Sequence, residues 1–118
     1  PQQAAQKVAL RAGKATEQTG MKVAGVIENM ASFTCPDCGS SHDLFGSGGG
    51  QELAEALDTE LLGRIPIDPR LVEGGDAGLP LVLAHPDVPA SIAMTEVAKQ
   101  IAAKKASIVG RSLPLSVS

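Results

Sequence analysis

Aromatic side chains are nearly absent from this sequence of 118 residues. It contains no tryptophan, no tyrosine and only two phenylalanines, Phe33 and Phe45. The hydrophobic fraction of 43% is enough to form a core, but that core must be built from Ala, Val, Leu and Ile. A chain of this length predicts one domain.

Long runs of one kind of residue are also absent. No apolar stretch approaches the roughly 18–20 residues that cross a bilayer, and no basic run is longer than Lys104–Lys105. With a net charge of -3, the sequence predicts no membrane partner and no nucleic-acid partner. The first residues, Pro1–Gly13, lack the layout of a signal peptide and an initiator Met. They indicate a cytoplasmic protein with reduced cysteines, present here as a fragment or a processed chain.

The order of apolar patterns predicts an α/β fold. Continuous apolar runs suit parallel strands covered on both faces, and stripes of helical period between Pro and Gly residues suit amphipathic helices. The predicted strands span 22–29 and 61–68, and an extended segment spans 79–87. The predicted helices span 1–19, 48–60 and 89–105, and the first of them has an apolar stripe of Ala5, Val8, Ala9, Ala12 and Ala15. A short helix begins at Pro69 after an Asp68 cap and ends at Gly74–Gly75, and an irregular tail spans 107–118. Two clear strands are few for a doubly wound sheet, so we expect part of a larger sheet.

Both cysteines lie in one short stretch, TCPDCG, which spans Thr34–Gly39. Two thiolates separated by two residues can bind one soft metal ion or cluster, act as a redox dithiol, or pack as small apolar side chains. Zinc and iron–sulfur sites normally need four ligands. A second copy of the chain would supply the missing pair, and His42 is a conceivable third ligand. Phe33 and Phe45 either anchor this loop to the core or cover a cluster.

Other motifs point to the carboxyl ends of the strands. The GSGGG stretch, Gly46–Gly50, lacks the Gly-Lys-Ser/Thr ending of a nucleotide-binding P-loop, so it predicts a flexible loop into a helix, with weak anion binding possible. Glu28–Asn29 and the IPIDP stretch, Ile65–Pro69, each end a strand. Ligands of α/β sheets bind at that edge. We assign no role to His85.

Taken together, these motifs resemble a known family. The stretches GVIENMASFTCPDCGSSHDLFGSGGGQELAEAL and LLGRIPIDPRLVEGGDAGLPLVLAHPDVPAS are similar to the C-terminal part of Mrp/ApbC-type proteins, which are MinD-related P-loop ATPases that carry iron–sulfur clusters. The resemblance covers roughly residues 1–103. It implies that residues 1–106 are the C-terminal portion of a parallel-sheet P-loop NTPase-like domain whose P-loop portion is absent from this chain. The chain alone is then not expected to hydrolyse ATP.

The resemblance also implies partners and a site. The family is a cytosolic homodimer in which one labile [4Fe-4S] cluster bridges the two subunits and passes to apo iron–sulfur proteins, supported by ATP and Mg. Its cluster ligands correspond to Cys35 and Cys38, and its nucleotide-contacting residues correspond to Asn29, Ile65, Pro66, Asp68 and Pro69. Two alternatives remain open, which are a dithiol oxidoreductase and a structural module bridged by zinc.

Overall fold

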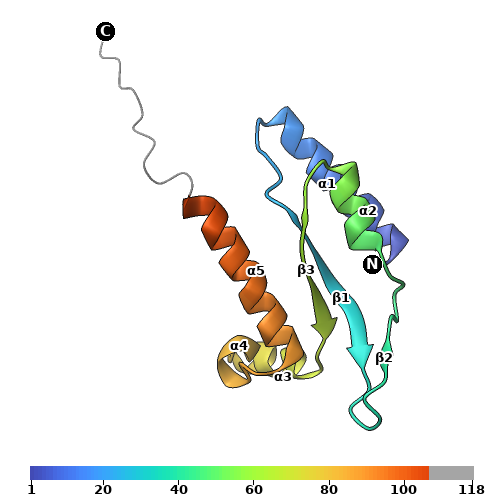
Figure 1. Ribbon diagram of the computed structural model, residues 1–118, viewed down its shortest axis with the longest axis vertical. Helices are drawn as coiled ribbons and strands as arrows, with labels where there is room; N and C mark the ends of the chain where they lie inside the picture. Colours follow the sequence, from blue (N-terminus) through green and yellow to red (C-terminus); the bar gives the residue numbers. More distant parts are fainter. Residues whose placement is uncertain (107–118) are drawn as a thin grey trace.

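The computed structural model describes residues 1–106 and has a mixed α/β fold. Its sheet has three strands. The central strand β1 (Val26–Thr34) runs parallel to β3 (Leu61–Ile67) and antiparallel to the two-residue β2 (Ser41–His42), as Figure 1 shows. The predicted fold class is therefore confirmed at the level of a mixed α/β fold. The predicted irregular tail over 107–118 lies outside the described residues. Within residues 1–106, no helix is both long enough and apolar enough to cross a bilayer.

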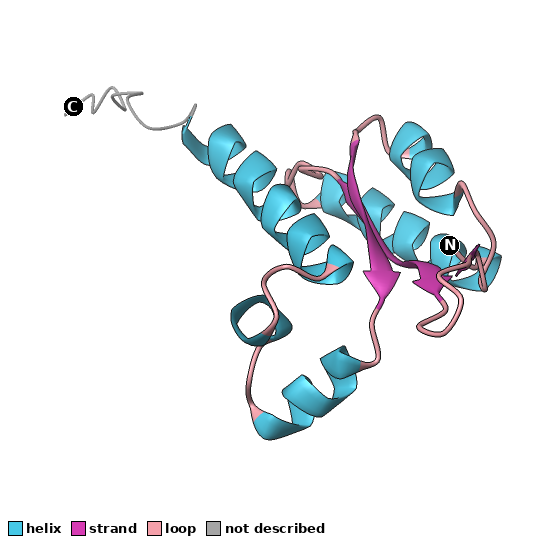
Figure 2. Ribbon diagram, turned by 60° about the horizontal axis from the view of Figure 1, so that its bottom comes forward, coloured by secondary structure: helices cyan, strands magenta, loops and turns pink. Residues whose placement is uncertain are grey.

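Helices cover the two faces of the β1–β3 pair. Helix α2 (Gly49–Ala56) packs against both strands on one face, and helix α5 (Pro89–Ala106) packs against β3 on the other (Figures 1 and 2). Gly63 lets α5 approach closely, because a Cβ built there would lie 2.5 Å from a Val97 methyl carbon. Parallel strands buried in this way explain the continuous apolar runs of the sequence.

Strand β1 differs from its prediction, because it begins four residues later and continues through Thr34. A bulge interrupts it. Asn29 is opposite Ile65 and Phe33 is opposite Ile67, so β1 uses four residues where β3 uses two. Met30 within the bulge has φ 54°, and its N–H donates to Asn29 Oδ1 at 2.9 Å. The bulge returns the chain to the ladder, so the residues just before the first cysteine form strand rather than loop.

Helix α1 (Gln3–Gln18) has the predicted extent, but the predicted apolar stripe is wrong. Val8 is 66% exposed, and the half-buried positions instead follow the line Gln6, Ala9, Leu10, Gly13 and Thr16. Gly13 decides this orientation. A Cβ there would lie 2.6 Å from the Leu57 methyl groups, so the glycine admits Leu57 and α1 packs on α2 through this line.

Helix α3 (Arg70–Ala77) continues past the glycine pair at which it was predicted to end. The end signal is a third glycine. Gly78 has φ 68°, a left-handed conformation that glycine adopts without steric cost. Leu79 N–H then donates to the Gly74 carbonyl at 2.8 Å. This closing hydrogen bond belongs to a common helix terminus of the Schellman type.

The segment predicted to be extended over 79–87 contains a one-turn helix, α4 (Leu81–Ala84), so that prediction is wrong. Pro80 precedes the turn, and its carbonyl accepts the Ala84 N–H at 3.1 Å. Leu81 is buried at 5% exposure. Burial of this leucine selects one helical turn in a stretch whose apolar residues alone suggest a strand.

Candidate functional site: the cysteine hairpin and its pocket

The two cysteines lie in the turn of a β-hairpin. Thr34 of β1 pairs with Ser41 of β2, and the turn between them is closed by backbone hydrogen bonds. Cys35 N–H donates to the Ser40 carbonyl at 2.9 Å, and Gly39 N–H donates to the Cys35 carbonyl at 2.9 Å. Gly39 has φ 72°, which a glycine tolerates. The turn places both thiols at the end of the central strand.

Both thiols are free, but their surroundings differ. Cys35 is half-buried and Cys38 is exposed. The Cys38 sulfur lies 3.3 Å from the Ser40 hydroxyl oxygen. The pKa of Cys38 lies below its usual value, because the Ser40 hydroxyl, then the Ser40 backbone amide, then the Cys35 thiol hydrogen-bond its sulfur. A thiolate is the form that binds metals and attacks electrophiles, so the turn favours that form at its exposed sulfur.

No third ligand joins the cysteine pair within residues 1–106. That part of the chain contains no group of three or more His, Cys, Asp or Glu side chains that could hold a metal ion. His42 is opposite Phe33 in the β1–β2 ladder and does not complete such a group. The hairpin of one chain therefore offers two sulfur ligands.

A pocket of about 440 Å³ opens beside the first cysteine. Its walls come from β1 and the hairpin turn, from the end of β3 with the start of α3, and from the start of α5. The lining residues are Phe33, Thr34, Cys35, Pro36, Pro66, Ile67, Asp68, Pro69, Arg70, Pro89 and Ala90. The pocket thus brings one predicted cluster ligand together with three of the five residues predicted to contact a nucleotide.

The two other predicted nucleotide residues, Asn29 and Ile65, are direct neighbours across the parallel β1–β3 ladder. Asn29 is exposed. Its side-chain oxygen accepts the Met30 N–H, and its NH₂ group takes no part in that bond. The predicted residues therefore form two neighbouring sets, one in the ladder and one in the pocket.

The Asp68 carboxylate is bound by Arg70. Arg70 Nε donates to Oδ1 at 2.8 Å and Nη2 donates to Oδ2 at 2.6 Å. The Arg70 backbone N–H also donates to Oδ1 at 3.0 Å. Helix α3 begins at Arg70 with Pro69 in the capping position, one residue later than predicted, so Asp68 bonds the first helical amide from just outside the cap. Asp68 is buried at 8% exposure. The hydrogen bond from Arg70 holds its pKa below the usual value, against the opposing effect of burial.

The two phenylalanines lie in different places. Phe33 lines the same pocket as Cys35, as expected for a residue that covers the thiols. Phe45 is 43% exposed and lines a separate hollow with Gln2 and Gln3 at the start of α1. Phe33 thus shares a pocket with Cys35, whereas Phe45 lines a different hollow.

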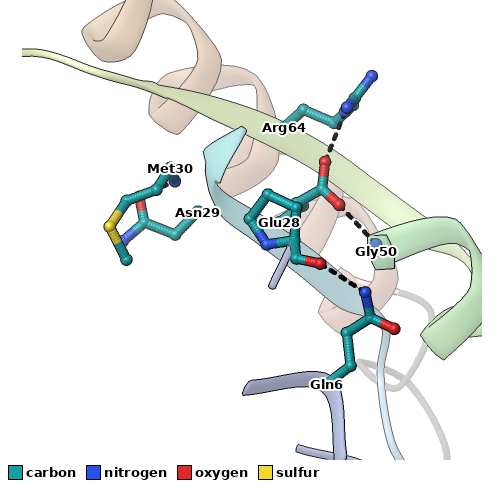
Figure 3. A network of polar contacts seen from close by, with 7 residues as sticks. Gln6, Glu28, Asn29, Met30, Gly50 and Arg64 are labelled. Carbon is teal, nitrogen blue, oxygen red and sulfur yellow. Dashed lines mark hydrogen bonds and ion pairs between the residues drawn. The ribbon is translucent and has the colours of Figure 1, made fainter. Parts of the chain in front are cut away.

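Glu28 has a structural role that the sequence did not predict, since the sequence indicated only a polar pair, Glu28–Asn29, at the end of a strand. It is buried at 4% exposure near the start of β1. Its Oε1 accepts Arg64 Nε at 2.7 Å, and its Oε2 accepts the Gly50 N–H at 2.5 Å (Figure 3). Burial alone would raise the pKa of Glu28, but the bonds from Gly50 and Arg64 outweigh it and the pKa lies below the usual value. An acidic residue inside an apolar run was the available signal.

This carboxylate also changes the interpretation of the glycine-rich stretch. The Glu28 carboxylate lies at the N-terminus of α2 and accepts the Gly50 N–H. This amide is therefore hydrogen-bonded within the chain rather than to an external anion. Gly50 must lack a side chain, because a Cβ there would lie 2.7 Å from the Glu28 Cβ. The stretch is therefore a structural junction between β1 and α2.

The chain is similar to known proteins. A family model of the ParA group, described as NUBPL iron-transfer P-loop NTPase, matches residues 1–102. Proteins named iron-sulfur cluster carrier protein are similar. The one from Mycobacterium tuberculosis is 43% identical over 98% of this chain and 32% of its own length. Those from Synechocystis and Pyrococcus furiosus are 44% and 45% identical over 81% and 72% of this chain, and 28% of their own length.

One solved structure is also similar. It is a nucleotide-binding protein from Archaeoglobus fulgidus in complex with ADP, in which cobalt was found. The identity is 43% and the TM-score is 0.53, over 61% of this chain and 30% of that one. This chain spans about a third of the length of the curated relatives that it matches. Because the family model covers nearly all of it, the chain belongs to the ParA/NUBPL family of iron-transfer P-loop NTPases, which includes the iron–sulfur cluster carrier proteins.

Proposed function

We propose that this chain carries a [4Fe-4S] cluster as cargo, held by Cys35 and Cys38 together with the same two cysteines of a second copy, and delivers it to apo-proteins in the cytoplasm. The observation that carries the proposal is the hairpin turn, which presents two free thiols at one end of the sheet. Membership of an iron-transfer family supports iron as the metal.

The number of ligands supports a shared site. A cluster of this type needs four thiolates, and residues 1–106 offer no third ligand beside the two sulfurs. A two-fold symmetric dimer doubles whatever one chain presents. Two hairpin turns facing each other therefore supply four thiolates, and the exposure of Cys38 leaves room for the second copy.

We assign nucleotide contact in the complete family protein to Asn29, Ile65, Pro66, Asp68 and Pro69. Pro66, Asp68 and Pro69 lie at or just beyond the carboxyl end of β3, where α/β sheets bind ligands, and Asn29 and Ile65 are paired in the adjoining part of the β1–β3 ladder. The relative from Archaeoglobus fulgidus was solved with ADP, which supports a nucleotide of that class. In this proposal residues 1–106 act as the C-terminal portion of the family's domain. The chain by itself does not hydrolyse ATP, because its sequence has no Gly-Lys-Ser/Thr triplet.

Anaerobic reconstitution with iron and sulfide tests the proposal. We expect about two iron and two sulfide ions per chain, which is half of a four-iron cluster, in a sample whose mass is that of a dimer. Cys35→Ala should lose the iron and the visible absorbance, whereas Ser41→Ala, next to the same turn, should keep both. Iron retained by Cys35→Ala, or full loading of a monomer, would contradict the shared site.

The same samples separate the two alternatives. Zinc instead of iron in protein purified without oxygen would indicate a structural zinc bridge with the same ligands. Insulin reduction by the apo chain would indicate a dithiol oxidoreductase. The fold disfavours the latter, because a thioredoxin-like motif places its first cysteine at a helix N-terminus, whereas Cys35 begins a hairpin turn and the next helix starts only at Gly49.

A further inference from the structure

The two sulfurs of the hairpin face different environments. Cys35 is half-buried and forms part of the wall of the 440 Å³ pocket. Its neighbours in that wall include Phe33 and Pro66, which are apolar. Cys38 is exposed and lies outside the residues that line the pocket. If the two cysteines were equivalent ligands, their sulfurs would have the same exposure and the same neighbours.

Ser40 contacts both halves of the turn. Its backbone carbonyl accepts the Cys35 N–H at 2.9 Å, which fixes the course of the chain. Its hydroxyl lies 3.3 Å from the Cys38 sulfur. The neighbouring Ser41 belongs to β2 and is paired with Thr34 through the ladder. The Ser40 side chain therefore contacts the Cys38 sulfur, whereas its backbone is hydrogen-bonded to the Cys35 backbone.

We infer that Cys38 is the first thiolate to leave the cluster during transfer, that Cys35 is the one retained until the acceptor has bound, and that Ser40 is the positioning residue that makes this order possible. The inference rests on the proposed function, because it concerns the release of the cluster that the hairpin is proposed to hold.

The physical reason lies in what each sulfur meets when its bond to iron breaks. A departing thiolate carries a full negative charge, and burying such a charge without a partner is costly. At Cys38, which is exposed in the single chain, the Ser40 hydroxyl lies 3.3 Å from the sulfur and is within reach to donate a hydrogen bond to the thiolate. At Cys35 the charge would develop in a half-buried position on a pocket wall that is mostly apolar, in which Arg70 is already paired with Asp68. Hydrogen bonds to cluster sulfurs are a recognised means of tuning such sites.

The exchange conserves atoms and electrons. A cysteine thiol of the acceptor releases its proton to solvent, and its sulfur forms a bond to iron. The bond between iron and the Cys38 sulfur breaks, and the electron pair stays on that sulfur. Ser40 donates its hydrogen bond to this thiolate, which then takes up a proton from solvent. No electron is transferred, and the iron and sulfide of the cluster are unchanged.

The order of release can be read directly on the loaded dimer. A ferrous chelator removes the iron while short pulses of iodoacetamide trap each cysteine as it is freed, and peptide mass spectrometry measures the two modified sites. We expect Cys38 to be labelled before Cys35. Ser40→Ala should reduce this lead by about two- to tenfold, as expected for loss of one hydrogen bond, and Ser40→Thr should restore it. Equal labelling, or a lead unchanged in Ser40→Ala, would overturn the inference.

Transfer to an apo-ferredoxin gives a second measurement on the same variants. We expect Ser40→Ala to load as much iron and sulfide as the parent chain but to deliver it about two- to tenfold more slowly, and Ser41→Ala to match the parent. If the parent chain takes up no iron and sulfide, both the proposed function and this inference fail. If Ser40→Ala loads and delivers like the parent, only the inference fails.

Discussion

Glu28 and Arg64 are opposite each other in the parallel β1–β3 ladder, and their side chains form an ion pair of 2.7 Å. The Glu28 side chain is almost completely buried, while Arg64 is about half exposed. Since the same carboxylate also accepts the amide of Gly50 in α2, one side chain joins both parallel strands and a covering helix.

Replacing this carboxylate should destabilise the fold. Glu28→Ala leaves a buried amide at Gly50 without its partner and Arg64 without its counter-ion, so we expect the free energy of unfolding to fall by about 2–4 kcal/mol. Urea denaturation followed by far-ultraviolet circular dichroism measures this in a chain without tryptophan. Glu96→Ala is the matched control. It removes an exposed pair with Lys99, for which we expect at most about 0.5 kcal/mol. Equal losses in the two variants would refute a special role for Glu28.

Stability should decline in acid because of Glu28 and Asp68. The pKa of each is lower in the folded chain than its usual value, so the folded state favours the charged form. The resulting stabilisation is complete above the usual carboxylate range of about 3.9–4.3. It is lost as the pH falls through the lower folded-state values. Urea midpoints measured from pH 7 downward should therefore drop over that window, and Glu28→Gln should make the drop shallower. A midpoint that rises as the pH falls would contradict this assignment.

Gly50→Ala should be destabilising even though alanine favours helices. The added Cβ would lie 2.7 Å from the Glu28 Cβ, so the strand and helix must separate, at a cost of about 1–3 kcal/mol. Gly75→Ala in α3 offers the opposite case, because a Cβ there meets nothing within 4 Å. We expect that variant to be stabilised by about 0.5–1 kcal/mol. Thermal unfolding of the two proteins should shift in opposite directions, and shifts of the same sign would contradict the packing described.

Met30→Gly should raise stability. Met30 has φ 54° in the bulge of β1, a conformation that costs a residue with a side chain about 1–2 kcal/mol. Allowing for the greater freedom of glycine in the unfolded chain, we expect a net gain of about 0.5–1 kcal/mol. Met21→Gly is the control, since Met21 is exposed and its φ is not positive, and it should give no gain. A loss of stability in Met30→Gly would indicate that the methionine side chain contributes contacts that outweigh its backbone conformation.

The sequence was sufficient to predict those elements whose signals are local. Apolar runs located β3 and the first residues of β1, although β1 starts later than predicted and continues to Thr34. Pro89 with the helical stripe that follows located α5 correctly. The cysteine pair and its lack of further ligands could likewise be recognised from spacing. The prediction of 79–87 as extended failed because burial of Leu81 decides the helical turn there, and burial depends on distant residues.

Features that depend on residues far apart in the sequence could not be predicted from local patterns. Glu28 and Gly50 are joined across 22 positions of the chain, and the bulge at Met30 depends on a left-handed conformation that methionine rarely adopts. The pocket beside Cys35 requires β1, β3 and α5 to be placed together. The contact of Ser40 with Cys38 was also missed, because serine in a turn usually signals only the turn itself.

The backbone hydrogen bonds of the cysteine turn affect the free energy with which the turn would bind and release a ligand. The Cys35 N–H donates to the Ser40 carbonyl and the Gly39 N–H donates to the Cys35 carbonyl, so the chain's own hydrogen bonds fix the course of the turn. In zinc fingers the metal supplies the folding free energy, and its removal unfolds the domain. Under the proposed function, a turn held by its own hydrogen bonds loses little further entropy when the cluster binds, and it is expected to stay folded when the cluster leaves. The proposed carrier is thus suited to repeated loading and unloading.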